Sequence, residues 1–186
     1  MKILGKTTVD QEFEDIYFSE ILAITAGIIG GIFLAKLSDN IGLTAGLFIL
    51  LPGLLEMQGN IYGSLSARVS NLLLIGKLND KKEIRYHIRQ NVLASLFLIL
   101  FISFVLGLIS YLFIYFFSGL HNPKIIFISV LSSFLSSVLE IPFTIYMAFW
   151  LYKHKFDPED IMGPYVTTLA DTISIISLVI VAGVFI

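Results

Sequence analysis

The chain has 186 residues, of which 56% are hydrophobic and only 14% are charged, whereas a soluble domain carries roughly a quarter charged residues. It contains no cysteine, which excludes disulfides, thiolate metal sites and cysteine nucleophiles. The formal net charge of −2 argues against a nucleic-acid partner. Apolar stretches long enough to cross a bilayer alternate with short polar joints, a pattern typical of an all-α integral membrane protein.

Five transmembrane helices are predicted along the chain, at 16–36, 41–76, 90–118, 124–152 and 158–186. The first apolar stretch follows acidic residues instead of a basic n-region, so it is predicted to be a retained span and not a cleaved signal. Residues 1–15 are too short for a separate domain. We therefore expect a cytoplasmic acidic segment at 1–15 and one transmembrane domain over 16–186.

The second apolar stretch is longer than the about 20 residues that a span requires. It also contains Pro52, Gly53, Glu56 and Arg68, which do not suit a helix that faces lipid. We predict two helical pieces with a break near Pro52–Asn60. Irregular backbone at membrane depth is tolerated only inside protein or beside a water-filled cavity, so the predicted break is a candidate functional region.

The distribution of basic residues predicts the orientation. Nine basic residues fall on one side of the predicted spans and two on the other. The first group is Lys2, Lys6, Lys77, Lys81, Lys82, Arg85, Arg89, Lys153 and Lys155, and the second is Lys36 and Lys124. Because cytoplasmic loops carry the excess of Lys and Arg, the N-terminus is predicted to be cytoplasmic and the C-terminus outside.

Four ionisable residues lie inside predicted spans: Glu56, Arg68, Glu140 and Asp171. Such groups are costly in hydrocarbon and usually face a bundle interior or a pathway. Arg68 is predicted to form a structural ion pair with Glu140 or Glu56, because an unpaired buried charge is penalised. Glu140 is either the partner of Arg68 or part of a pathway, and we favour the pairing.

Asp171 lies near the middle of the last predicted span, within a stripe of oxygen-bearing side chains. Thr167, Asp171 and Ser174 are spaced i, i+4, i+7 and share one helix face, and Thr168 precedes Asp171 by three residues. Hard divalent cations prefer oxygen ligands, and Mg²⁺ keeps much of its water, so a pathway for it needs few carboxylates. We favour a cation site here over the alternative, a protonated aspartate bonded to a neighbouring helix.

The start of this last helix is marked by Asp157 as a candidate N-cap and by Pro158 in the first turn. Gly163–Pro164 is predicted to interrupt the helix one turn later. Such an interruption would free backbone carbonyls beside Thr167 and Asp171.

At the predicted break in the second span, Asn60 offers a neutral side-chain oxygen next to the exposed backbone of Gly59. The equally favoured alternative for Asn60 is a helix cap after the break. Glu56 precedes Asn60 by one helical turn. It is either a second ligand or a residue at the aqueous mouth.

The run Leu51-Pro52-Gly53-Leu54-Leu55-Glu56-Met57-Gln58-Gly59-Asn60, followed by Ser66-Ala67-Arg68, resembles the membrane-domain signature of MgtE-type magnesium transporters and their eukaryotic solute-carrier relatives. Asp157-Pro158 and the run Gly163-Pro164-Tyr165-Val166-Thr167-Thr168-Leu169-Ala170-Asp171 resemble the segment that leads to the family's intramembrane aspartate. The resemblance implies a magnesium-permeable homodimer with a pore at the two-fold axis, in which Asp171 of both subunits binds the hydrated ion. Glu56 departs from the small or apolar residue expected at its position.

The expected protein is therefore a multi-pass protein of the cell membrane and not an enzyme. Its expected partners are a second copy of itself, membrane lipid and the divalent cation, with Mg²⁺ as the transported ion. We expect a stand-alone half without the cytoplasmic regulatory domains of the bacterial transporters, so their gating is not carried over. Three alternatives remain open: a sodium- or proton-coupled divalent cation exchanger using Glu140 or Glu56, an intramembrane enzyme acting on lipids, and a non-catalytic assembly subunit.

Overall fold

The computed structural model describes residues 17, 21, 24, 25, 27–29, 31, 32, 35, 41–74, 81–154 and 158–185. Its helices are α2 (Ile41–Leu74), α3 (Lys81–Ser118), α4 (Lys124–Lys153) and α5 (Pro158–Phe185). None of the described residues lies in a strand, so the predicted all-α fold is confirmed over this part of the chain. The residues described between 17 and 35 are helical, whereas segment 1–15 and Asp157 lie outside the described residues.

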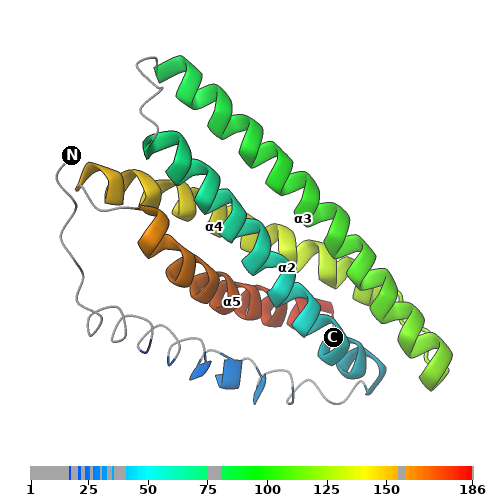
Figure 1. Ribbon diagram of the computed structural model, residues 1–186. Coiled ribbons are helices and arrows are strands. Elements are labelled where there is room, and N and C mark those ends of the chain that lie inside the picture. The colour runs from blue at the N-terminus through cyan, green and yellow to red at the C-terminus, as the bar shows by residue number, and fades with distance from the viewer. Residues whose placement is uncertain are drawn as a thin grey trace.

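The helices α2 to α5 form one bundle in which consecutive helices run antiparallel (Figure 1). Both α2 and α4 pack against α3 on one side and against α5 on the other, and they also contact each other. Among these four helices, α3 and α5 make no contact with each other. The centre of the bundle therefore lies along α2 and α4, where Leu54, Tyr62 and Ile128 are fully or almost fully buried.

Three of the helices are long and apolar enough to cross a membrane, at Lys82–Ser118, Lys124–Lys153 and Val166–Phe185. This finding agrees with a multi-pass membrane protein. Large apolar side chains cover the outside of the bundle, as expected for a surface in contact with lipid. On α3 and α4 they include Phe97, Phe101, Phe116, Phe127 and Phe134.

The predicted break in the second span is wrong. α2 is one continuous helix of 34 residues with Pro52 inside it. A proline within a helix removes one backbone hydrogen bond and costs about 3 kcal/mol, whereas a break would leave several backbone groups without partners. Because α3, α4 and α5 all pack against α2, the continuous helix is the better solution.

The predicted interruption at Gly163–Pro164 is also not observed, because α5 is helical from Pro158 to Phe185. α3 begins at Lys81, well before the predicted start at residue 90, and has 38 residues. A helix of this length spans about 57 Å at about 1.5 Å per residue, but the hydrocarbon core is about 30 Å thick. The polar N-terminal turns of α3 therefore continue the helix beyond the hydrocarbon.

Small and polar residues hold the helices together. A Cβ atom at Gly107 of α3 would lie 2.9 Å from the Cα atom of Ile126 in α4, so glycine is required for this close approach. Ser129 Oγ donates a hydrogen bond to the carbonyl oxygen of Ser103 at 2.6 Å, which links α4 to α3. Ser110 Oγ donates to the carbonyl oxygen of Gly46 at 2.8 Å, which links α3 to α2. These contacts fix the framework on which α5 packs.

Candidate cation site

The predicted ligands on α2 lie on an exposed face of that helix. Glu56 and Asn60 are both exposed, and Asn60 Nδ2 donates a hydrogen bond to Glu56 Oε1 at 2.9 Å. The two side chains are one helical turn apart, which is the spacing at which helix neighbours meet. Asn60 therefore lies inside a helix and does not cap one. The pair presents a carboxylate and an amide oxygen on the outside of a single protomer.

The predicted ligands on α5 lie at the edge of the packed interior. Thr167, Thr168 and Asp171 are all half-buried. A Cβ atom at Gly59 would lie 3.8 Å from Thr167 Cγ2, so α2 and α5 are neighbours at this level. Two of the predicted site residues, Gly59 and Thr167, are thus brought together by the packing of α2 on α5.

Ser174, the last member of the predicted stripe, differs from the others because it is buried. Its hydroxyl group donates to Gln58 Oε1 of α2 and contacts the carbonyl oxygen of Ala170. Ser136 Oγ of α4 donates to the same Gln58 oxygen at 2.6 Å. A buried polar junction of three helices is therefore formed by Gln58, Ser136 and Ser174. It lies about one helical turn beyond Asp171 along α5.

The structure does not bring Arg68 and Glu140 together. Arg68 is exposed, and its guanidinium donates to Ser64 Oγ at 2.9 Å and to Asn91 Oδ1 at 3.4 Å. Both oxygens of Glu140 are buried and accept no hydrogen bond. Glu56 accepts its hydrogen bond from Asn60, so neither predicted acidic partner holds Arg68 among the contacts described. Arg68 extends from the surface of α2 toward α3, whereas Glu140 lies in the interior.

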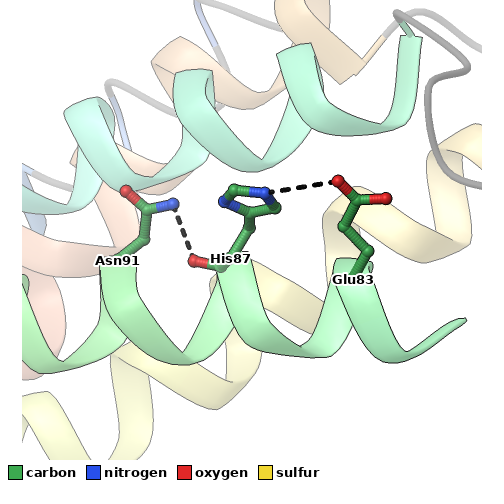
Figure 2. A network of polar contacts seen from close by, with 3 residues as sticks. All are labelled: Glu83, His87 and Asn91. Atoms are coloured by element: carbon green, nitrogen blue, oxygen red, sulfur yellow. Dashed lines mark hydrogen bonds and ion pairs between the residues drawn. The ribbon is translucent and has the colours of Figure 1, made fainter. Parts of the chain in front are cut away.

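Arg68 instead reaches a polar network at the start of α3, outside the apolar part of that helix. Figure 2 shows that Glu83, His87 and Asn91 follow one another along α3. Asn91 Nδ2 donates to the carbonyl oxygen of His87 at 2.9 Å, and His87 Nε2 lies 4.0 Å from Glu83 Oε1. Through Asn91, Arg68 thus connects the second half of α2 to the polar end of α3.

Glu140 is completely buried in α4, and it is close enough to Asp171 of α5 for the two carboxylates to repel each other. It continues a row of buried polar residues that we call the serine stripe, which consists of Ser129, Ser132, Ser133, Ser136 and Ser137. This stripe was not among the predicted site residues, although its spacing of three and four residues places it on one helix face together with Glu140 and Thr144. This periodicity was the signal available in the sequence.

The described residues contain no group of three or more His, Asp or Glu side chains that could enclose a metal ion. A closed cage made only of charged ligands is therefore absent from this part of the chain. The arrangement instead combines single carboxylates with hydroxyl, amide and backbone oxygens. Such ligand sets suit a magnesium ion that keeps several of its water molecules.

Comparison with known proteins identifies the family. The family model MgtE, described as a divalent cation transporter, matches residues 51–181, which is more than half of the chain. The chain belongs to the MgtE family.

The match begins in α2 and ends in α5, so it includes all of the predicted cation ligands. Membership makes the protein a divalent cation transporter and places it in a transporter family and not an enzyme family. No curated protein and no solved structure matches the chain. The resemblance to MgtE-type transporters inferred from the sequence motifs is thereby confirmed.

Proposed function

We propose that the protein is a magnesium channel or transporter of the cell membrane whose pore lies between two copies of the chain. Asp171 of each copy faces the symmetry axis, and together the two carboxylates hold a hydrated ion. The observation that carries this proposal is a half-buried aspartate in the apolar helix α5, inside the region that matches the family. A carboxylate at this depth is costly unless it faces a hydrated path or a partner.

Further support comes from the exposed polar face of α2. Glu56, Asn60 and Arg68 are all exposed in one protomer, whereas large apolar side chains cover much of the outside of the bundle. Exposure of the Glu56 carboxylate and the Asn60 amide to lipid is strongly unfavourable. A second copy packed on this face removes them from lipid. In this arrangement Glu56 and Asn60 lie at the pathway, near the Gly59–Thr167 contact.

Each predicted ligand then has a role that matches its chemistry. Asp171 supplies the negative charge that selects a cation. Thr167 and Thr168 supply hydroxyl oxygens that contact the ion's water, and Asn60 supplies a neutral oxygen from α2. Gly59 lies beside Thr167 where the two helices pack. Neutral ligands bind weakly enough to release the ion again, as conduction requires. The N-terminus is cytoplasmic in this proposal.

Magnesium flux into liposomes that contain the purified protein tests the proposal. Asp171→Asn keeps the size of the side chain and removes its charge, which is worth about 2 to 8 kcal/mol for a divalent ion about 4 Å away. We expect flux through the variant to fall by about tenfold or more while the protein remains folded and dimeric. Glu83→Gln, at the polar end of α3, is the matched control and retains wild-type flux.

Asn60→Ala provides a second, independent test of the pathway. It removes a neutral oxygen from α2, and we expect a smaller loss of flux than in Asp171→Asn. Wild-type flux in both folded variants contradicts the assigned pathway. Parallel measurements with Mn²⁺, Co²⁺ and Zn²⁺ establish whether Mg²⁺ is the preferred ion.

A further inference from the structure

Glu140 has no role in the proposed pore, yet it is the buried acidic residue of the central helix α4. Its side chain is 0% exposed, and neither carboxylate oxygen has a hydrogen-bond partner. Taking a carboxylate out of water costs several kcal/mol unless other groups compensate for the lost hydration. A carboxyl group in this situation is stable only if it carries a proton or lies beside a bound cation.

Two neighbouring side chains are in the same situation. Tyr62 of α2 and Thr144 of α4 are both 0% exposed, and neither hydroxyl group has a partner within normal hydrogen-bond distance, although Ser136 of α4 lies near the Tyr62 hydroxyl. Thr144 follows Glu140 by one helical turn and lies on the same face of α4. Tyr62 is close enough to Glu140 for their side chains to interact electrostatically. The two carboxyl oxygens of Glu140 and the hydroxyl oxygens of Tyr62 and Thr144 are thus four buried oxygen atoms without hydrogen bonds on two neighbouring helices.

We propose that Glu140, Tyr62 and Thr144 bind a small hard cation, Na⁺ or a divalent ion, inside each protomer. All four atoms are oxygens, which are the ligands that such cations prefer. A proton on Glu140 removes the charge and adds one hydrogen-bond donor. A cation contacts several oxygens at once and balances the negative charge. Because the site is buried, the ion binds there with most of its water removed.

This site is separate from the proposed site at the symmetry axis, but the two are coupled. Glu140 and Asp171 interact electrostatically, so a cation at Glu140 reduces the negative potential at Asp171. Repulsion between ions at adjacent sites favours release of the one in the pathway. The inference rests on the proposed function only in assigning Asp171 to the pathway, because the site itself lies within one protomer.

Equilibrium binding of radioactive Mn²⁺ and of radioactive Na⁺ to the purified full-length protein in detergent tests this site. For one of the two ions, we expect Glu140→Gln to remove one bound ion per protomer. Asp171→Asn instead removes at most one divalent ion per dimer. The stoichiometry therefore distinguishes the two sites, and the ion that is lost identifies the natural occupant of the Glu140 site.

Tyr62→Phe and Thr144→Val keep the shape of their side chains and remove one oxygen each, so they test the site even if Glu140→Gln does not fold. We expect each to weaken binding of the same ion about tenfold, the lower end of what loss of a group supporting a bound metal costs. Thr172→Val is the matched control, because the Thr172 hydroxyl already donates to the carbonyl oxygen of Thr168 at 3.0 Å.

Binding of both ions at wild-type stoichiometry and affinity in folded Tyr62→Phe, Thr144→Val and Glu140→Gln overturns the inference and leaves a protonated carboxyl group at Glu140. Loss of binding in these variants together with wild-type flux in Asp171→Asn supports the Glu140 site and rejects the proposed pore. Loss of flux in Asp171→Asn with unchanged binding in the Glu140 variants supports the proposed pore and rejects the Glu140 site. The two proposals therefore fail separately.

Discussion

At Gly107, a single hydrogen atom in place of a side chain allows the backbones of α3 and α4 to touch. A Cβ atom there would lie 2.9 Å from both the Cα atom of Ile126 and the Cβ atom of Ser129. We expect Gly107→Ala to lower the free energy of unfolding by about 1 to 3 kcal/mol, because overpacking forces the helices apart. Denaturant or thermal unfolding of the purified protein in detergent measures this change.

Gly183→Ala is the control for this prediction, since a Cβ atom at Gly183 meets no atom within 4 Å. Alanine is also the better helix former there, by about 1 kcal/mol or less. Equal stability of the two variants would show that α3 and α4 do not approach each other at Gly107.

The residues of the candidate site were predictable to different degrees. Asp171 and Asn60 stand out in the sequence because they are polar residues in apolar surroundings. Gln58 and Ser136 could not be paired in advance, because a serine in an apolar helix bonds equally well to its own backbone, as Ser137 does to Phe134. The ion pair between Arg68 and Glu140 was expected because opposite charges inside a membrane attract each other. In the structure, Arg68 instead donates hydrogen bonds to neutral oxygens.

At the scale of elements, Pro52 provides a test of the continuous helix. Its side chain is exposed, and it lies inside α2 without a backbone N–H group. If α2 is continuous in the working protein, Pro52→Ala restores one hydrogen bond and raises the free energy of unfolding by up to about 3 kcal/mol. Pro123→Ala, at the N-cap of α4, is the control and has a smaller effect, because a missing N–H group is tolerated at a helix start. Thermal unfolding measures both, and a loss of stability in Pro52→Ala would favour a broken helix.

Helix boundaries followed closely from the sequence where a polar joint separates two apolar runs. The predicted starts of α2, α4 and α5 at residues 41, 124 and 158 agree with the structure. The start of α3 was placed too late, because hydrophobicity marks where a helix enters lipid and not where its hydrogen bonding begins. The predicted breaks failed for a related reason. Local rules for proline do not include the packing of α2 against three other helices, which outweighs the loss of one hydrogen bond.

For the whole molecule, the absence of cysteine makes the proposed dimer easy to test. Ala67 is exposed on α2, next to Arg68, on the face that we propose to be covered by the second copy. We expect Ala67→Cys to form a disulfide-linked dimer on oxidation in native membranes, because facing residues near a symmetry axis approach within the about 4.4 to 6.8 Å between Cα atoms that a disulfide requires. Non-reducing gel electrophoresis detects the product.

Phe116→Cys is the control for the cross-link, because Phe116 is 75% exposed on α3, far along the surface that faces lipid. It remains monomeric on the gel. Efficient cross-linking through position 116 and none through position 67 would place the dimer interface on α3, and would remove the argument that the polar face of α2 is covered by a second copy.

The serine stripe also has a consequence for how the protein is made. Apart from Ser133, its serines bond to other helices or to their own backbone, and Ser136 is linked through Gln58 to Ser174 of α5. Of the four helices, α5 is the last to leave the ribosome. Until it inserts, Gln58 and Ser136 bond to each other, but the place that Ser174 of α5 occupies beside them is open to lipid. Biogenesis of the bundle therefore ends with α5, and ribosome stalling before this helix is complete leaves an intermediate in which the polar side chains of Gln58 and Ser136 lack their neighbour Ser174.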